Sequence, residues 1–267
     1  MKGNTLLAIG AALGGSAVVY EKLLRAPILT WGATTEEVGA RFPGDELLEH
    51  ADGVATRAIT IEAPASAVWP WIAQMGPSPR GGAYTYDWIE NLLGLNMHSA
   101  DRVLPEFQHP RVGDGFGYGS NKMSFAIVEP DHVLATQSAD GNWVWTFILR
   151  EQEGRTRLIS RNRFRLPRLE DKIGMVPMEP ASLVMERKML VGIKKRAEQL
   201  AIERGDVLIR ERPNSSSTGR LLVETRAPAG ALVWVVILPA AYAGQGFESR
   251  MFRKLFVRSR TAGFGFG

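Results

Sequence analysis

The chain contains no cysteine. This absence excludes a disulfide framework, thiolate zinc sites and a cysteine nucleophile. Histidine is also scarce, and the spacing of His50, His98, His109 and His132 matches no metal-binding pair. The sequence lacks a phosphate-binding P-loop, a dinucleotide fingerprint and the G-x-S-x-G serine motif as well. We therefore predict no metal site and no cofactor, and no standard motif identifies a catalytic residue.

An excess of charge is missing too, because the formal net charge is only +4. Much of the basic excess lies at 155–168 and 250–260. A protein that binds nucleic acid generally presents a stronger basic face, so we do not expect a nucleic-acid partner. A hydrophobic content of 45% and a charged content of 22% are ordinary for a globular protein. A length of 267 residues fits one large domain with appendages, or two small domains.

An uncharged apolar segment, residues 6–20, lies near the N-terminus. As a helix it would extend for about 23 Å, short of the ~30 Å hydrocarbon core, and Asn4 and Thr5 would bring it to the lower limit for a span. We predict that residues 1–27 form a membrane anchor. A helix packed on the protein and a cleaved signal peptide are the alternatives. Lys22 and Arg25 follow the segment, which favours a membrane-associated protein with its main domain in the cytoplasm.

A second apolar segment, residues 229–243, contains Pro239 and is short for a span. The basic amphipathic stretch 250–260 follows it, and either an anionic membrane surface or the protein's own domain could bind this stretch. We assign residues 206–267 to a C-terminal appendage. Residues 28–50 are predicted to form an ordered connector, with a short helix capped by Thr34 or Thr35.

The central region, residues 51–205, has the element pattern of an α+β domain. Residues 54–64 alternate as a strand does, and two short helices are expected at about 66–75 and from Asp87, where Glu90 completes a capping-box pattern. Five short strands follow at hairpin spacing, at 116–119, 123–128, 133–138, 143–150 and 156–166. Pro180 is predicted to open a long final helix that ends at Gly205.

Several strings in this order resemble the START-like superfamily, which has the helix-grip fold and includes polyketide cyclase/dehydratase and lipid-transport proteins. They are RAITIEAPASAVWPWIAQMG, YTYDWIENLLG, VGDG, TRLISRNR and MERKMLVGIKKRAE. The resemblance covers residues 31–204 and implies a curved antiparallel sheet that wraps around the long C-terminal helix. It also implies an apolar ligand between the two, and carries over no catalytic residue. Position 83 holds alanine where a large aromatic is expected, which predicts a roomier cavity.

Glu186 is the most unusual residue of the last helix, because it lies within the apolar arc of that helix. Charged residues are almost never fully buried unless they are paired. One interpretation is an ion pair with an arginine of the sheet or with Arg57. A second is a polar anchor or general acid whose pKa is raised by desolvation. Exposure through a bent helix is the third.

Aromatic residues give the other candidates, since Trp143 and Trp145 share one strand face and further aromatics cluster before residue 90. Ser160 and Asn162 would offer hydrogen bonds from the concave face. The alternating arginines would point the other way, to a solvated or ion-paired convex face; they are Arg157, Arg161, Arg163 and Arg165. The candidate ligand-binding residues are Trp71, Met75, Tyr84, Tyr86, Trp88, Trp143, Trp145, Ser160, Asn162, Glu186, Met189 and Ile193.

We therefore predict a START-like domain that binds an apolar small molecule or lipid at a membrane. The first alternative is a cyclase/dehydratase-type enzyme that uses Glu186, Tyr84 or Tyr86 for proton transfer. The second is a structural or interaction module with a filled cavity. The sequence does not identify the ligand or the oligomeric state.

Overall fold

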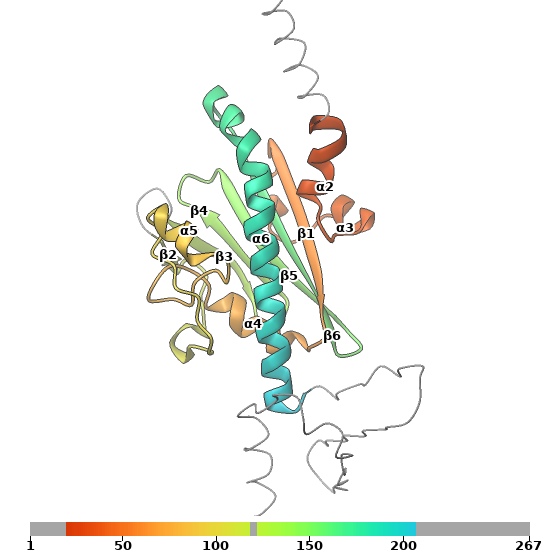
Figure 1. Ribbon diagram of the computed structural model, residues 1–267, viewed down its shortest axis with the longest axis vertical. Helices are drawn as coiled ribbons and strands as arrows, with labels where there is room; N and C mark the ends of the chain where they lie inside the picture. The colour runs from red at the N-terminus through yellow and green to blue at the C-terminus, as the bar shows by residue number, and fades with distance from the viewer. Residues whose placement is uncertain (1–19, 118–121, 207–267) are drawn as a thin grey trace, which may run out of the picture. The chain divides into compact units, whose positions relative to one another are not determined.

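The computed structural model describes residues 20–117 and 122–206. Its centre is one antiparallel sheet with the strand order β1-β6-β5-β4-β3-β2 (Figure 1). The strands are β1 (Gly53–Ile61), β2 (Gly115–Phe116), β3 (Met123–Glu129), β4 (Val133–Ser138), β5 (Trp143–Gln152) and β6 (Arg155–Phe164). Strands β3 to β6 follow one another as hairpins, while β1 joins the sheet through β6.

One long helix, α6 (Leu169–Arg204), crosses a face of the sheet (Figure 1). Two short helices, α4 (Ala65–Ala73) and α5 (Asp87–Leu92), follow β1, and η3 (Pro105–Phe107) precedes β2. This is the helix-grip architecture that the START-like resemblance implies, so the fold prediction is confirmed. The main core lies where α4 and α6 meet the sheet, and its fully buried members include Ile61, Val68, Ile72, Leu158, Leu190 and Ile193.

The two faces of the sheet follow from the alternation of side chains along each strand. Opposite Arg57 of β1 lies Ser160 of β6, and opposite Ser160 lies Phe147 of β5, so these three share the face under α6. The neighbours Ile159 and Ile148 are also paired, and they point to the other side. There they form a second, smaller core with Phe42 and Ala58.

Two elements of the connector lie on this second face, α3 (Thr35–Gly39) and η2 (Asp45–Leu48). The elements before them, η1 (Tyr20–Leu24) and α2 (Arg25–Leu29), lie beside α6 instead, where Tyr20 and Arg25 contact Glu179. Thr34, one of the two expected caps, is the N-cap of α3, and it also forms a full capping box with Glu37. The Arg157 Nε donates to Glu37 at 2.7 Å, and the Arg161 Nε donates to Asp45 at 2.8 Å. The predicted ion-paired face thus finds its carboxylates in the connector.

Two local predictions are wrong. The helix α6 begins at Leu169 rather than at Pro180, and both Pro177 and Pro180 lie inside it. An interior proline costs roughly 3 kcal/mol, but here the affected turns are held by contacts of Glu179 with Tyr20 and Arg25.

The capping box expected at Asp87 is also absent, because the N-cap of α5 is Tyr86. The Asp87 carboxylate instead accepts hydrogen bonds from the backbone N–H and the hydroxyl of Ser99, at 2.7 and 2.6 Å. The Asp87 side chain, which the local pattern assigned to capping α5, therefore holds the loop at Ser99 instead.

In the parts of the chain that the structure describes, no helix has both the length and the apolar content needed to cross a bilayer. The predicted anchor falls outside these parts, apart from Tyr20 and the residues that follow it. The apolar segment 229–243 and the basic stretch 250–260 lie outside the described residues as well.

Candidate functional site

A cavity of about 610 Å³ lies between the concave face of the sheet and α6. Small-molecule sites commonly measure roughly 300–1,000 Å³ and are mostly apolar with a few polar groups. This cavity has that character. Its wall is formed by Leu29, Ala55, Arg57, Pro77, Ala83, Thr85, Glu90, Gly94, Leu95, Met97, Phe116, Gly117, Met123, Trp143, Trp145, Asn162, Phe164, Met175, Met178, Glu179, Ser182, Met185, Glu186 and Met189.

Two tryptophans of β5 form an aromatic wall. The rings of Trp143 and Trp145 are stacked, with their centroids 5.9 Å apart and an interplanar angle of 13°. The alternation of β5 brings both to the concave face, and each indole N–H is satisfied by the next strand. Trp143 donates to the Asn162 Oδ1 and Trp145 donates to the Ser160 Oγ, both at 2.9 Å. The rings are thereby fixed with an indole face available to the cavity.

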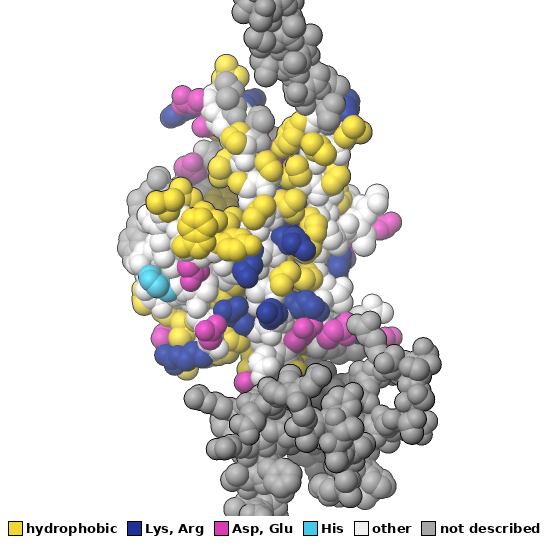
Figure 2. All heavy atoms as spheres, viewed as in Figure 1, with side chains coloured by type: hydrophobic (Ala, Val, Ile, Leu, Met, Phe, Trp, Pro, Cys, Tyr) yellow, Lys and Arg dark blue, Asp and Glu magenta, His cyan; other side chains and the backbone are white. Residues whose placement is uncertain are grey.

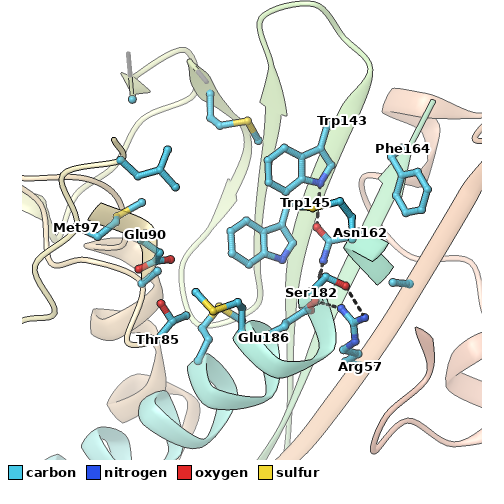
Figure 3. A pocket seen from close by; sticks show the side chains of 18 of the residues that line it. Arg57, Thr85, Glu90, Met97, Trp143, Trp145, Asn162, Phe164, Ser182 and Glu186 are labelled. Atoms are coloured by element: carbon cyan, nitrogen blue, oxygen red, sulfur yellow. Dashed lines mark hydrogen bonds and ion pairs between the residues drawn. The ribbon is translucent and has the colours of Figure 1, made fainter. Parts of the chain in front are cut away.

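A charged pair is built into the same wall. The Arg57 Nη1 donates to the Glu186 Oε2, and the Asn162 Nδ2 lies 3.3 Å from the other carboxylate oxygen (Figure 3). Arg57 also donates to the Ser182 Oγ at 2.9 Å and to the backbone carbonyl of Ile28 at 3.1 Å. The ion pair of Glu186 with Arg57, the first interpretation, is therefore present, and the third interpretation, exposure through a bent helix, is wrong.

Burial affects the protonation of this pair. Desolvation raises the pKa of the Glu186 carboxyl, and the adjacent Arg57 guanidinium opposes part of that rise. The side chains are 8% and 1% exposed, respectively. The pair therefore offers a fixed, dry polar point in an apolar cavity, which can orient a ligand by hydrogen bonds.

The helix α6 contributes a row of methionines, at positions 175, 178, 185 and 189. Their spacing of three, seven and four residues keeps them on one helix face. Methionine is flexible and polarisable, and it adapts to differently shaped apolar partners. This side of the cavity is suited to shape adaptation, in contrast to the hydrogen-bonded tryptophans across from it.

The segment around α5 closes the remaining side. Ala83 lines the cavity, in agreement with the expectation that a small residue there leaves room for a ligand. Glu90 and Thr85 lie on the same side, and their side chains are next to each other in Figure 3. Desolvation raises the pKa of the Glu90 carboxyl; the Thr85 hydroxyl opposes that rise and the charge of Asp87 adds to it.

The predicted site residues divide into three groups. Trp143, Trp145, Asn162, Glu186 and Met189 line the cavity. Buried in the protein without forming part of the cavity wall are Trp71, Met75, Tyr84, Ser160 and Ile193. Tyr86 and Trp88 are 36% and 68% exposed, and they do not line the cavity either.

Tyr84 illustrates the second group. Its hydroxyl donates to the backbone carbonyl of Trp71 at 2.9 Å, and burial raises its pKa above the ordinary value. Its ring meets the Trp71 ring edge-on, with the centroids 6.0 Å apart. Tyr84 therefore fixes α4 against the loop behind the cavity.

Sequence reasoning missed several lining residues. The methionine row could have been found, because its helical spacing is visible in the sequence. Thr85, Glu90 and Met97 carried no such signal, since they come from a short helix and irregular loops whose path depends on tertiary contacts. Within the described residues, no group of three histidine, aspartate or glutamate side chains is placed to hold a metal ion.

No family model matches the sequence, and no curated protein matches it. Similar solved structures include the Polyketide_cyc-like protein Cgl2372 from Corynebacterium glutamicum, with 16% identity and a TM-score of 0.36 over 59% of this chain and 97% of that one. Protein MLL2253 from Mesorhizobium loti has 17% identity and a TM-score of 0.33 over 58% of this chain and all (100%) of that one. The KanY protein has 13% identity and a TM-score of 0.37, and the match covers 56% of this chain and 99% of that one. The fold assignment rests on the strand order and on α6, not on these low TM-scores.

Proposed function

We propose that this protein binds an apolar small molecule or lipid in the cavity between the sheet and α6, for transport or sequestration at a membrane. The observation that carries the proposal is the cavity itself, about 610 Å³ with an aromatic wall facing a methionine row. A protein interior is ordinarily packed with few voids larger than a water molecule. A space of this size, lined by apolar side chains, is therefore suited to an apolar occupant.

The membrane part of the proposal is supported by the mouth of the cavity. Met178 and Trp143 both line the cavity and are 55% and 40% exposed, so part of the apolar wall reaches the protein surface. Further exposed apolar side chains lie next to the cavity, at Trp88 and Leu92 of α5 and at its C-cap residue, Leu93. Figure 2 shows apolar side chains gathered over α5 and the upper part of α6 on this face. An apolar rim of this kind marks an interaction surface for a membrane or a partner.

No specific observation favours the cyclase/dehydratase alternative. The Tyr84 hydroxyl is already engaged with the Trp71 carbonyl, and Tyr86 does not reach the cavity wall. Glu186 is held by Arg57, which makes it a fixed hydrogen-bonding group. The filled-module alternative has less support still, because the described side chains leave the cavity open.

Binding of pyrene to the full chain tests the proposal, with energy transfer from tryptophan to pyrene as the readout. We expect saturable binding, because pyrene is apolar, flat and small enough for the cavity. Ala83→Phe should weaken it severalfold by filling space at the cavity wall. The matched control is Ala139→Phe, the same substitution at an exposed turn position. A folded wild-type chain that neither binds pyrene nor carries a lipid in native mass spectrometry would favour the filled module.

A further inference from the structure

Two polar groups of the cavity wall have no hydrogen-bond partner among the described residues. They are the Oε2 of Glu90 and the Oγ1 of Thr85, and both atoms are buried. Glu90 as a whole is only 8% exposed. An unsatisfied buried polar group costs roughly 1–3 kcal/mol, and native proteins contain few of them. The Thr85 hydroxyl is near enough to lower the pKa of the Glu90 carboxyl, but neither atom has a partner in the described parts of the chain that meets the distance and angle of a hydrogen bond. Two such side chains on the wall of an open cavity point to a ligand that completes them.

These groups lie on a different side of the cavity from the charged pair. In Figure 3, Glu90 and Thr85 stand together, with Trp143 and Trp145 across from them. The Arg57–Glu186 pair, in contrast, is completed by Asn162 and Ser182. The pair therefore needs no ligand to satisfy its hydrogen bonds, whereas Glu90 and Thr85 do.

The chemistry of this corner selects the type of ligand group. A carboxyl buried beside apolar side chains favours its neutral form, and the direction of the Glu90 pKa agrees with this. A neutral carboxyl and a hydroxyl can each donate and accept a hydrogen bond. They match a ligand hydroxyl or keto oxygen. An anionic group is disfavoured here, because Asp87 also acts on Glu90 and Glu186 lies on the same cavity.

The opposite wall selects the body of the ligand. The Trp143 and Trp145 rings are nearly parallel and are fixed by hydrogen bonds to β6. Rigid aromatic faces favour flat ring systems, which stack on them without losing conformational freedom. A flexible chain would fit the methionine row but would gain less from the tryptophans.

We propose that Glu90 and Thr85 form a subsite for a hydroxyl or keto oxygen of a flat, uncharged ring system that lies against Trp143 and Trp145. The inference rests on the proposed function and narrows its ligand class. Glu90 and Thr85 act as binding residues that position the ring, and no reaction is assigned to them.

The test compares pyrene with 1-hydroxypyrene, which differ by one hydroxyl, on the full chain. The readout is the ratio of the two dissociation constants, pyrene over 1-hydroxypyrene. Glu90→Leu should lower this ratio about tenfold, and Thr85→Val, which keeps the shape of the side chain, about threefold. Glu90→Gln keeps a donor and an acceptor and should hold the ratio within about threefold of wild type. Glu106→Gln is the control, because Glu106 is exposed and lies outside the cavity wall.

Each outcome bears on a separate claim. If pyrene itself fails to bind, the proposed function fails, and the subsite with it. If pyrene binds and neither Glu90→Leu nor Thr85→Val changes the ratio, only the subsite is overturned. A Glu90-dependent preference for 1-pyrenemethylamine over 1-hydroxypyrene would also overturn it, because Glu90 would then be an anion that pairs with a cation. Should Glu90→Leu fail to fold, Thr85→Val decides the outcome.

Discussion

The Arg57 guanidinium and the Glu186 carboxylate, 129 positions apart in the chain, form a buried ion pair that joins β1 to α6. Arg57 extends the connection to the connector through the Ile28 carbonyl. One side chain thus contacts the sheet, the long helix and the segment before the first strand. The same pair is part of the cavity wall, so it contributes both to folding and to the proposed binding site.

Removing one partner of this pair should be costly. We expect Arg57→Met or Glu186→Leu to reduce the free energy of unfolding by about 3–5 kcal/mol, because each leaves an uncompensated buried charge. The double variant Arg57→Met/Glu186→Leu should recover most of the loss, since apolar side chains of similar volume can replace a buried pair. Urea unfolding of the full chain measures all three. A double variant no more stable than its weaker parent would contradict the prediction.

Acid should loosen the connector through Glu37. Its contact with Arg157, the largest cause, holds the pKa of the Glu37 carboxyl below its ordinary value of 4.5, although burial opposes this. A carboxyl with a lowered folded pKa binds fewer protons in the folded state than in the unfolded state. Its stabilising contribution is therefore complete above pH 4.5 and is lost as the pH falls through the folded pKa.

The variant Glu37→Gln tests this expectation. At neutral pH it should be less stable than wild type by about 1–3 kcal/mol, the value of charged hydrogen bonds that are partly buried. The difference should shrink as the pH falls below the ordinary glutamate value. Urea unfolding at a series of pH values provides the measurement. A difference that stays constant down to the acid range would show that Glu37 acts through packing and not through its charge.

Two glycines of α6 should respond in opposite directions to replacement by alanine. A Cβ at Gly192 would lie 2.7 Å from the Tyr84 carbonyl oxygen, whereas a Cβ at Gly174 would meet nothing within 4 Å. Gly174→Ala should therefore stabilise the helix by about 0.5–1 kcal/mol. Gly192→Ala should cost about 1–3 kcal/mol, because α6 must move away from the loop behind the cavity. Thermal unfolding distinguishes the two, and equal shifts of the same sign would disprove the close contact.

The sequence predicts the sheet and the charged pair well, for physical reasons. Alternation along β5 and β6 is a local property, so it assigns Trp145 and Asn162 to one face and Arg161 to the other before any tertiary contact is known. A charged residue on an apolar helix arc needs a partner, and this rule anticipates the pairing of Glu186 with Arg57. These two arguments alone place Arg57, Trp145, Asn162 and Glu186, all of which line the cavity.

The remaining wall could not be predicted, because it depends on contacts between distant residues. The aromatic string before α5 indicates burial, yet Tyr84 turns into the core while Trp88 points outward. The sequence does not reveal that α6 begins at Leu169, because Pro180 is a strong local signal for a helix start. The contact that supports the earlier start joins Glu179 to Arg25, and these residues are 154 positions apart in the chain. Glu90 looked like a helix cap, and only the fold shows that it lines the cavity.

The exposed face of α5 provides the last prediction, which concerns the membrane. Trp88, Leu92 and Leu93 are between 68% and 80% exposed. Full-length protein in vesicles should have Trp88 at the lipid interface, where indole rings are favoured. Lipids brominated on their acyl chains should then quench part of the tryptophan emission, and Trp88→Phe should remove that part. Trp69→Phe is the control, since Trp69 is 6% exposed in the core.

Exposed apolar neighbours should strengthen this insertion. We expect Leu92→Ser/Leu93→Ser to reduce the quenching of Trp88, because two apolar side chains no longer enter the lipid. Ile202→Ser is the matched control on an exposed apolar residue, 41% exposed and about 20 Å along α6 from the last lining residue, Met189. It should leave the quenching unchanged. If Trp88→Phe retains the full quenching of wild type, α5 does not meet the bilayer, and the apolar rim must serve a protein partner instead.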